Sequence, residues 1–361
     1  GVTGSGKTEV YLQVIAEVLR RGRQAIVLVP EIALTPQVLG RFAARFQDRV
    51  TVLHSALSLG ERFDQWCKIY EGRVDVVVGA RSAVFAPLPR LGLIVLDEEH
   101  ERTYKQEEGS IRYHTREVAI KRCELVGGQV VLGSATPAVE SYHQALKGEY
   151  VLAELPERVE KRPLPAIEVV DMREEFSEGN RSMFSRRLRD ELAALAGTDR
   201  QAIMLLNRRG FSSFVLCREC GEVLGCPNCQ VSLTYHKGVN RLKCHYCLHQ
   251  EPLPERCPRC ASPYLRQFGV GTEQLEEALN KEFPALRTVR LDADTTKRKG
   301  AHASILRQFA QGQAQVLIGT QMVAKGLDFP RVTLVGVLAA DLSLRFPDIR
   351  SSERTFQLLT Q

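Results

Sequence analysis

The chain has 361 residues, of which 44% are hydrophobic and 25% are charged. Because domains cluster near about 100–150 residues, this length predicts two or three folding units, and the composition excludes a disordered or fibrous chain. The net charge of +6 permits an anionic partner without requiring one. No apolar run approaches the ~20 residues of a membrane span, so we expect no membrane partner. The chain opens without Met and without a secretion signal, which leads us to expect a fragment of a cytoplasmic protein.

The first third of the chain alternates predicted helix and strand. Apolar residues recur at four-residue steps over 8–21, which predicts a helix with one apolar stripe. Short apolar runs follow at 25–29, 74–78, 91–96 and 129–133, and each is short enough for a strand buried on both faces. This alternation is typical of a parallel sheet that is covered by helices.

The same alternation returns in the second half. Apolar runs at 201–207, 314–319 and 332–338 predict strands of a second parallel sheet, and 301–311 predicts a helix. Three prolines and several charges make 155–166 a linker. We therefore predict an α/β fold of two lobes with a small insertion in the second lobe. Its parts are lobe one at 1–158, the start of lobe two at 159–211, the insertion at 212–264 and the remainder of lobe two at 265–361.

The octapeptide at the start matches G-x-x-x-x-G-K-[ST] and leads directly into the first predicted helix. It consists of Gly1, Val2, Thr3, Gly4, Ser5, Gly6, Lys7 and Thr8. In such a loop the backbone N–H groups surround a β-phosphate, the lysine reaches the β- and γ-phosphates, and the threonine holds magnesium. The sequence therefore predicts a site for ATP and Mg²⁺.

The apolar run at 91–96 ends in an acidic motif, Asp97-Glu98-Glu99-His100. In a doubly wound sheet, ligands bind beyond the carboxyl ends of the strands. We expect Asp97 to hold the magnesium shell, and Glu98 to orient and deprotonate the attacking water. A charged loop cap is the alternative interpretation, and His100 could be an ordinary exposed histidine.

Eight of the ten cysteines lie in four C-x₂-C pairs. The pairs are Cys217/Cys220, Cys226/Cys229, Cys244/Cys247 and Cys257/Cys260. Two such pairs make one closed tetrahedral site for a structural Zn²⁺, so the sequence predicts two zinc ions. The spacing leaves sequential and nested pairing open, and disulfides are disfavoured in a reducing compartment. We expect the nearby His236, His245 and His249 to stay on the surface, and Cys67, Cys123 and Trp66 to fill a core.

The composition of the insertion argues against an autonomous DNA-binding domain. It has few large apolar side chains, so bound zinc must supply much of its folding free energy. Six basic and four acidic residues lie between 212 and 262, and four thiolates around each Zn²⁺ make the loaded segment net negative. We therefore expect a docking surface or, if the chain acts on nucleic acid as the resemblance described next implies, a strand-separating wedge.

These motifs resemble those of the superfamily 2 helicases, where Asp-Glu-x-His follows a P-loop and precedes a motif like Gly133-Ser134-Ala135-Thr136-Pro137. The stretches at 28–37, 78–87 and 318–330, together with the eight cysteines, are similar to the primosomal protein N′ family of bacterial replication-restart helicases. The resemblance covers nearly the whole chain. It implies two RecA-like lobes and nested zinc sites. One site would comprise Cys217, Cys220, Cys257 and Cys260, and the other Cys226, Cys229, Cys244 and Cys247.

The resemblance also implies roles for further residues. Ser134 and Thr136 would couple the ATP site to DNA. Residues near the nucleotide in lobe two would be Gly326 and Asp328. Residues along the bound DNA strand would be Pro30, Glu31, Arg81, Ser82, Thr320, Gln321 and Lys325. Residues of an aromatic-rich loop at 103–114 would be Tyr104, Lys105, Arg112 and Tyr113, where rings can stack on bases for ~1–3 kcal/mol each. A solvated loop is the alternative for this last segment.

The function that this resemblance implies is an ATP-dependent 3′-to-5′ DNA helicase that recognises stalled or collapsed replication forks and initiates primosome assembly. Its partners would be branched and single-stranded DNA, single-stranded DNA-binding protein, and primosome or helicase-loading proteins. The family continues beyond residue 361 into an arginine motif, so we expect this segment alone to hydrolyse ATP negligibly. Two alternatives are a non-unwinding loader that binds nucleotide and DNA, and a translocase on double-stranded DNA.

Overall fold

The computed structural model divides the chain into two units, Gly1–Pro165 with Thr360–Gln361, and Ala166–Leu359. The division lies within the segment 155–166 that was predicted to be a linker. The structure describes all residues except 31–35, 56, 162, 207–213, 230, 237, 269–270, 293, 297–299, 321–322, 324–328, 342–343 and 345–347. The predicted site residues that lie outside the described residues are Glu31, Gln321, Lys325, Gly326 and Asp328.

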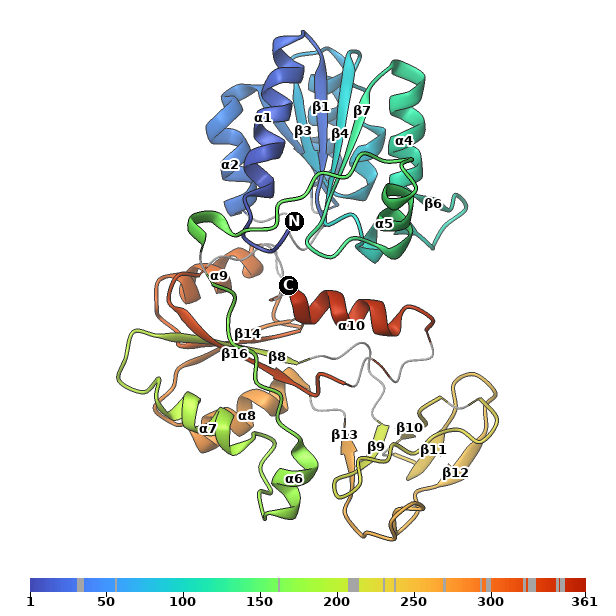
Figure 1. The fold of residues 1–361 in the computed structure, drawn as a ribbon, viewed down its shortest axis with the longest axis vertical. Coiled ribbons are helices and arrows are strands. Elements are labelled where there is room, and N and C mark those ends of the chain that lie inside the picture. Colours follow the sequence, from blue (N-terminus) through green and yellow to red (C-terminus); the bar gives the residue numbers. More distant parts are fainter. Residues whose placement is uncertain are drawn as a thin grey trace. The chain divides into compact units, whose positions relative to one another are not determined.

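The first unit contains a five-stranded sheet in which every neighbouring pair runs parallel (Figure 1). Its strands are β1 (Gln24–Leu28), β2 (Val50–Leu53), β3 (Val76–Gly79), β4 (Leu91–Asp97) and β7 (Gln129–Gly133). Their order is β2-β3-β1-β4-β7. The four predicted strands are confirmed, and β2 is an additional edge strand that the sequence pattern did not reveal.

Helices cover both faces of this sheet. They are α1 (Lys7–Arg20), α2 (Pro36–Phe46), α3 (Leu59–Tyr70) and α4 (Thr115–Val126), and a further helix, α5 (Val139–Leu146), follows β7. Along β1 the side chains alternate between two cores. Ile26 and Leu28 pack in the core that includes residues of α3 and α4, whereas Ala25 and Val27 pack in the core that includes residues of α1 and α2.

Cys123 and Trp66, which were both expected to fill a core, differ in burial. Cys123 is buried, as expected. Trp66 is 42% exposed and lies on α3 with the exposed Phe63 and Tyr70, so the expectation that it fills a core is wrong. A single tryptophan carries no information about helical phase, and the buried residue of α3 is Ile69.

The second unit repeats the architecture with a four-stranded parallel sheet of order β14-β15-β8-β16. Its strands are β8 (Gln201–Leu206), β14 (Thr288–Leu291), β15 (Val316–Gly319) and β16 (Val332–Leu338). Its helices are α6 (Met172–Ser177), α7 (Arg186–Ala193), α8 (Thr272–Glu282), α9 (Ala301–Ala310) and α10 (Ser351–Thr360). Leu192 and Leu275 are buried on one face of the sheet, and Phe309 and Leu358 on the other. The predicted α/β fold with two parallel sheets is therefore confirmed.

The cysteine-rich segment is inserted between β8 and α8. Strand β9 (Phe214–Cys217) pairs antiparallel with β13 (Leu265–Phe268). The strands β10 (Thr234–His236), β11 (Arg241–Lys243) and β12 (Gln250–Pro252) form a three-stranded antiparallel sheet. A small core inside the insertion contains Val215, Leu224, Val231, Leu233 and Leu242 with two of the cysteines.

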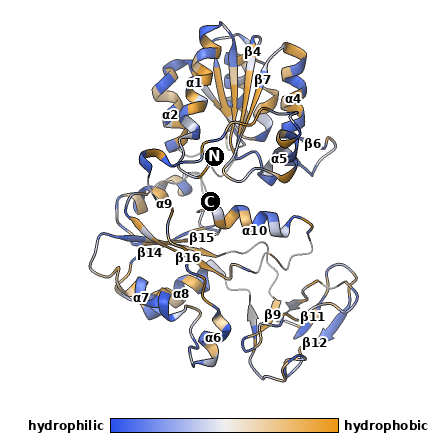
Figure 2. Cartoon of the chain, viewed as in Figure 1, coloured by the Kyte–Doolittle hydropathy of each residue, from blue (hydrophilic) through white to orange (hydrophobic). Residues whose placement is uncertain are grey.

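Apolar residues concentrate in the strands of the two parallel sheets, whereas β11 and β12 of the insertion are largely hydrophilic (Figure 2). Burial of strands on both faces explains the continuous apolar runs that the sequence shows. Among the residues that the structure describes, no helix has both the length and the apolar character of a membrane span.

Candidate nucleotide site and metal centres

The predicted P-loop leads into the amino terminus of α1, which begins at Lys7. Gly6 caps this helix in the left-handed conformation, with φ of 84°, which a residue with a side chain would adopt only under strain. Residues 155–159 lie along the loop: the Val2 N–H donates to the Leu155 carbonyl and the Val159 N–H to the Gly4 carbonyl, both at 3.0 Å. The loop thus has the helix-terminal position that suits a phosphate.

Asp97 ends β4 directly beside the last residue of β7. The parallel register pairs Asp97 with Gly133. A Cβ atom at Gly133 would lie 1.7 Å from the Tyr11 hydroxyl, and that hydroxyl donates a hydrogen bond of 2.9 Å to Asp97 Oδ1. Because Tyr11 lies one helical turn after Lys7, the P-loop helix is held against the acidic motif.

The electrostatics of this position fit a divalent cation. Burial raises the pKa of the Asp97 carboxyl, and this effect is opposed by the Tyr11 hydrogen bond and by the positive charge of Lys7. A desolvated carboxylate next to a phosphate-binding loop is stabilised by a cation, and hard oxygen ligands such as Asp97 and the Thr8 hydroxyl are those that Mg²⁺ prefers. The structure therefore brings together the predicted residues Lys7 and Asp97 at one end of the sheet.

Glu98 and His100 follow in a tight turn. Glu98 has a φ of 50°, a left-handed conformation that is uncommon outside glycine and that often occurs at functional sites. The side chain of His100 is 1% exposed, and its Nδ1 lies 2.7 Å from Ser134 Oγ, while its Nε2 lies 3.7 Å from Glu98 Oε2. His100 is therefore not an exposed histidine but a bridge between the acidic motif and the Ser-Ala-Thr motif.

Glu99 forms a second bridge, which the sequence did not reveal. Its side chain is 1% exposed and accepts hydrogen bonds from the Ala138 N–H at 2.7 Å and from Ser141 Oγ at 2.8 Å. Arg116 Nη1 lies 3.4 Å from the same carboxylate. Because Ala138 and Ser141 begin α5 directly after the Ser-Ala-Thr motif, Glu99 fixes that motif to the end of β4.

The predicted DNA-contact loop forms a short hairpin of β5 (Lys105–Gln106) and β6 (Tyr113–His114). Tyr104 is 1% exposed, and its hydroxyl donates to the carbonyls of Leu28 and Asp97 at 2.9 and 2.7 Å. A ring held in the core cannot stack on a base, so the prediction of a DNA contact at Tyr104 is wrong.

The other predicted DNA contacts of the first unit occupy different environments. Arg81 Nη1 donates to the carbonyls of Thr103 and Lys105, and thereby braces the loop. Tyr113 is half-buried, with its ring edge against Phe85 at 5.1 Å. The exposed residues are Ser82, Lys105 and Arg112. Pro30 is buried, and in the second unit Thr320 is half-buried just after β15.

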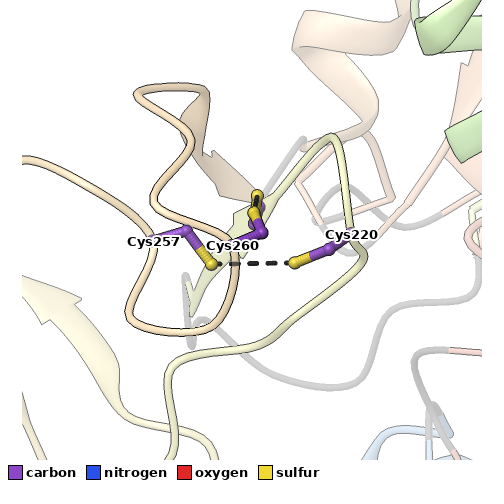
Figure 3. Close-up of side chains that lie close together, drawn as sticks. Cys220, Cys257 and Cys260 are labelled. Carbon is purple, nitrogen blue, oxygen red and sulfur yellow. Dashed lines mark hydrogen bonds between the residues drawn. The ribbon is translucent and has the colours of Figure 1, made fainter.

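The cysteines form two clusters in the nested arrangement. Cys217, Cys220, Cys257 and Cys260 make one, and Cys226, Cys229, Cys244 and Cys247 the other, with all ligand atoms of a cluster within 4.8 Å of one another. Sulfur pairs lie 3.5–3.6 Å apart, for example Cys220 and Cys257 (Figure 3). Tetrahedral Zn–S bonds of about 2.3 Å require a separation near ~3.8 Å, whereas a disulfide requires about 2.0 Å. The geometry therefore fits zinc, and sequential pairing is excluded.

The pKa values of the cysteine thiols are shifted in both directions. The His249 N–H and neighbouring thiols lower the pKa of Cys247 to about 6. Burial raises the pKa of Cys217, but N–H groups of Cys220 and Glu219 outweigh it and leave a value of about 7. In contrast, the neighbouring Cys247 thiol and burial raise the pKa of Cys229 to about 12. Four thiolates can coexist at such distances only when a metal ion neutralises them.

Three family models match successive parts of the chain. The DEAD/DEAH box helicase model matches residues 1–145, and the Helicase conserved C-terminal domain model matches 266–355. The model of the PriA DNA helicase Cys-rich region (CRR) domain matches 226–252, inside the insertion.

Curated relatives match the chain from end to end. Replication restart protein PriA of Bacillus subtilis (strain 168) is 58% identical over 100% of this chain and 45% of the relative. Along its whole length the chain is similar to the PriA replication restart proteins. PriA of Synechocystis sp. is 54% identical and PriA of Treponema pallidum 47%, each over 100% of this chain, which covers 44% and 54% of those relatives. The chain thus spans about half the length of these PriA proteins.

Solved structures share the fold at low sequence identity. The DUF1998 helicase MrfA, bound to DNA and AMPPNP, has a TM-score of 0.53 and 15% identity over 99% of this chain and 43% of that chain. Dbp5 of S. cerevisiae, bound to RNA and ADP BeF3, has a TM-score of 0.50 and 17% identity over 93% and 68%. These similarities show that the chain shares a fold of two RecA-like lobes.

Proposed function

We propose that this chain is the motor segment of an ATP-dependent DNA helicase that acts in replication restart and moves from 3′ to 5′ along one strand. The observation that carries the ATP-dependent part is the meeting of the P-loop helix with Asp97 through the 2.9 Å Tyr11 hydrogen bond. The replication-restart part rests on the PriA relatives. The polarity rests on the family resemblance.

In this proposal different residues of the first unit have different roles in ATP hydrolysis. Backbone N–H groups of Gly4 to Thr8 bind the β-phosphate, and the Lys7 ammonium binds the β- and γ-phosphates. Thr8 and Asp97 would hold magnesium, which would supply positive charge to the phosphate oxygens. Glu98 takes the proton of the attacking water, and Gly326 and Asp328 contribute from the second lobe.

The two buried bridges link this chemistry to the adjacent motif. His100 joins Glu98 to Ser134, and Glu99 joins the end of β4 to the first turn of α5. A change at the γ-phosphate that moves Glu98 would reach Ser134 and Thr136 through contacts of 2.7–3.7 Å. We propose that these contacts couple hydrolysis to DNA.

The proposed DNA surface combines exposed and braced residues. Lys105 and Arg112 offer charges for phosphates, Ser82 is exposed, and Tyr113 offers part of a ring. In lobe two the proposed DNA contacts are Thr320, Gln321 and Lys325. The proposed targets are branched and single-stranded DNA at stalled or collapsed forks in the bacterial cytoplasm.

For the insertion we propose docking rather than phosphate binding. The loaded module is net negative, and exposed apolar side chains occur on it at Val239, Tyr246 and Leu248, each at least 64% exposed. Aromatic residues such as Tyr246 are enriched at protein–protein interfaces. Single-stranded DNA-binding protein and primosome or helicase-loading proteins are the proposed partners.

The test is strand displacement by the complete protein on partial duplexes that carry either a 3′ or a 5′ single-stranded tail. We expect ATP-dependent displacement from the 3′-tailed substrate, and a loss of about 10²–10⁴-fold in ATP turnover for Glu98→Gln with nucleotide binding retained. Binding without displacement would favour the loader. Displacement of a triplex strand without duplex unwinding would favour the double-strand translocase.

A further inference from the structure

A short helix of the second unit packs against the cysteine insertion. Helix α6 (Met172–Ser177) carries Phe176 in its last turn, and this side chain is 4% exposed. The Phe176 ring meets the ring of Tyr264 edge to face, with centroids 5.2 Å apart. Tyr264 follows shortly after Cys260, the last ligand of the first zinc site, so this aromatic pair joins the helix to that site.

Two arginines complete the contact. The Arg181 guanidinium lies over the Phe176 ring at 3.7 Å and near the Tyr264 ring at 5.3 Å. The Arg218 guanidinium lies 4.9 Å from the Phe176 ring and donates to the carbonyls of Arg181 and Ser182 at 2.9 and 3.0 Å. Stacked guanidinium groups of this kind stabilise a contact beyond their hydrogen bonds.

Both halves of the first zinc site take part in this contact. Arg218 lies between the ligands Cys217 and Cys220, and its N–H donates to the Tyr264 carbonyl at 3.0 Å, which ties the two halves together. A Cβ atom at Gly221 would lie 3.0 Å from the Arg173 side chain of α6, so the turn after Cys220 also rests on the helix.

The second zinc site has a different environment. Its ligands Cys226 and Cys244 are buried in the small core of the insertion, and Tyr246 in its outer turn is 68% exposed. The ring, cation–π and close contacts that join α6 to the insertion are made by Arg218, Gly221 and Tyr264, all next to the first site.

We propose that the two zinc sites have unequal roles: the Cys217/Cys220/Cys257/Cys260 site anchors the insertion to lobe two through α6, whereas the other site only folds the outer part. Zinc binding and α6 packing then stabilise each other, because energetic coupling between two sites is reciprocal. Phe176, Arg181, Arg218 and Tyr264 are the positioning residues of the anchor. They act as the outer shell that holds metal ligands in place.

The first test isolates each site with a matched ligand variant. Cys260→Ser and Cys247→Ser each remove an exposed ligand, one from each site, and native mass spectrometry verifies the remaining zinc. Phe176→Leu, which keeps an apolar side chain but removes the ring, is added to each background. Zinc release is followed with the chelator 4-(2-pyridylazo)resorcinol.

We expect Phe176→Leu to speed release roughly tenfold or more where only the anchor site is filled, and to have no effect where only the outer site is filled. Arg218→Lys should act in the same direction, because lysine has no planar group to stack and bridge two carbonyls. Tyr246→Ala, in the outer turn, is the control and should leave the anchor site unchanged. Equal acceleration at both sites, or none at either, would overturn the proposal.

The second test measures whether the loss of either zinc site changes the local stability of α6 and the residues that follow it. It needs no assay of activity. Hydrogen exchange of residues 172–182 is compared in the Cys260→Ser and Cys247→Ser variants. Reciprocal coupling predicts faster exchange in this segment for Cys260→Ser and wild-type exchange for Cys247→Ser. Wild-type exchange in both variants, or faster exchange in both, would contradict the unequal roles.

Discussion

At the scale of single residues, Glu99 is the clearest case of a buried charge with a structural task. Its carboxylate accepts from Ala138 and Ser141 and faces Arg116, which also pairs with the 65% exposed Glu117. We predict that Glu99→Gln lowers the free energy of unfolding by about 2–4 kcal/mol, because removing one member of a buried pair leaves the other uncompensated.

Glu117→Gln is the matched control for this prediction, since it removes the other partner of the same arginine at the surface. Exposed ion pairs contribute little to stability. Urea unfolding of both variants checks the comparison. Equal losses in the two variants would show that Glu99 is not the residue that fixes α5.

For Asp97 we predict that removal of the charge raises stability, whereas for Glu99 we predict that it lowers stability. Its pKa in the folded state is raised, chiefly by burial, so its contribution to stability is fully present below the unfolded pKa of about 3.9 and is lost as the pH rises through the folded value. We therefore predict that Asp97→Asn melts at a higher temperature than the wild type at pH 8 without metal, although it cannot hold magnesium. This advantage should shrink as the pH falls towards ~4.

The exposed Asp64 supplies the control for Asp97, because Asp64→Asn should change the melting temperature little at any pH. Scanning calorimetry in EDTA across this pH range is the measurement. A lower melting temperature for Asp97→Asn at pH 8 would mean that the carboxylate is well solvated in the absence of metal.

The cysteine ligands predict how zinc affinity depends on pH. Ser262 N–H lowers the pKa of Cys260, but burial and neighbouring thiols outweigh it and give about 12, and Cys229 also has a pKa of about 12. Both thiols are therefore protonated near neutral pH, and zinc must displace their protons. We predict that zinc binding releases protons and that the affinity rises with pH, measured by calorimetry in buffers of different ionisation enthalpy. An affinity that is constant from pH 6 to 8 would contradict this.

At the scale of elements, the P-loop helix, the buried strands and the four C-x₂-C pairs were predictable because each depends on local spacing. Strand runs such as 91–96 are apolar because both faces of the sheet are covered, and this signal survives in the sequence. Edge strand β2 has an alternating burial pattern over four residues, which is too short to distinguish it from a loop.

The site residues that escaped prediction act through contacts distant in sequence. Tyr11 and Gly133 are 122 positions apart, yet the hydroxyl of one occupies the space of a side chain that the other lacks. Glu99 meets Ser141 across two elements. For Tyr104 the sequence predicted exposure, and the structure shows burial. An aromatic residue among charged neighbours in the sequence is expected to be exposed, because the sequence does not show the core against which the ring packs.

Two substitutions can separate the structural role of Tyr104, which holds the β5–β6 hairpin on the core, from the proposed role of the hairpin in DNA binding. We predict that Tyr104→Phe lowers stability by about 1–3 kcal/mol, because the carbonyls of Leu28 and Asp97 lose their donor. Arg112→Ala should instead leave stability unchanged, weaken DNA binding and reduce its salt slope by about 1. Unfolding and salt-dependent DNA titrations of both variants check this. A loss of DNA affinity without loss of stability in Tyr104→Phe would restore a DNA contact at that ring.

At the scale of the whole molecule, the resemblance in motif order predicted two parallel-sheet lobes and the nested zinc pairing, and the structure confirms both. Spacing alone could not decide the pairing, because it depends on how β9 and β13 bring the outer cysteine pairs together. The predicted roles of Gln321, Lys325, Gly326 and Asp328 stay predictions.

The claim on which the motor function depends is that the P-loop and Asp97 serve one nucleotide. A crystal structure with AMP-PNP and Mn²⁺ tests this claim most directly, since manganese can be located by its anomalous signal. We expect phosphates against the N–H groups of Gly4 to Thr8, with manganese in coordination distance of Thr8 and Asp97 or their bound water. Nucleotide bound elsewhere, or manganese far from Asp97 while phosphates fill the loop, would contradict it.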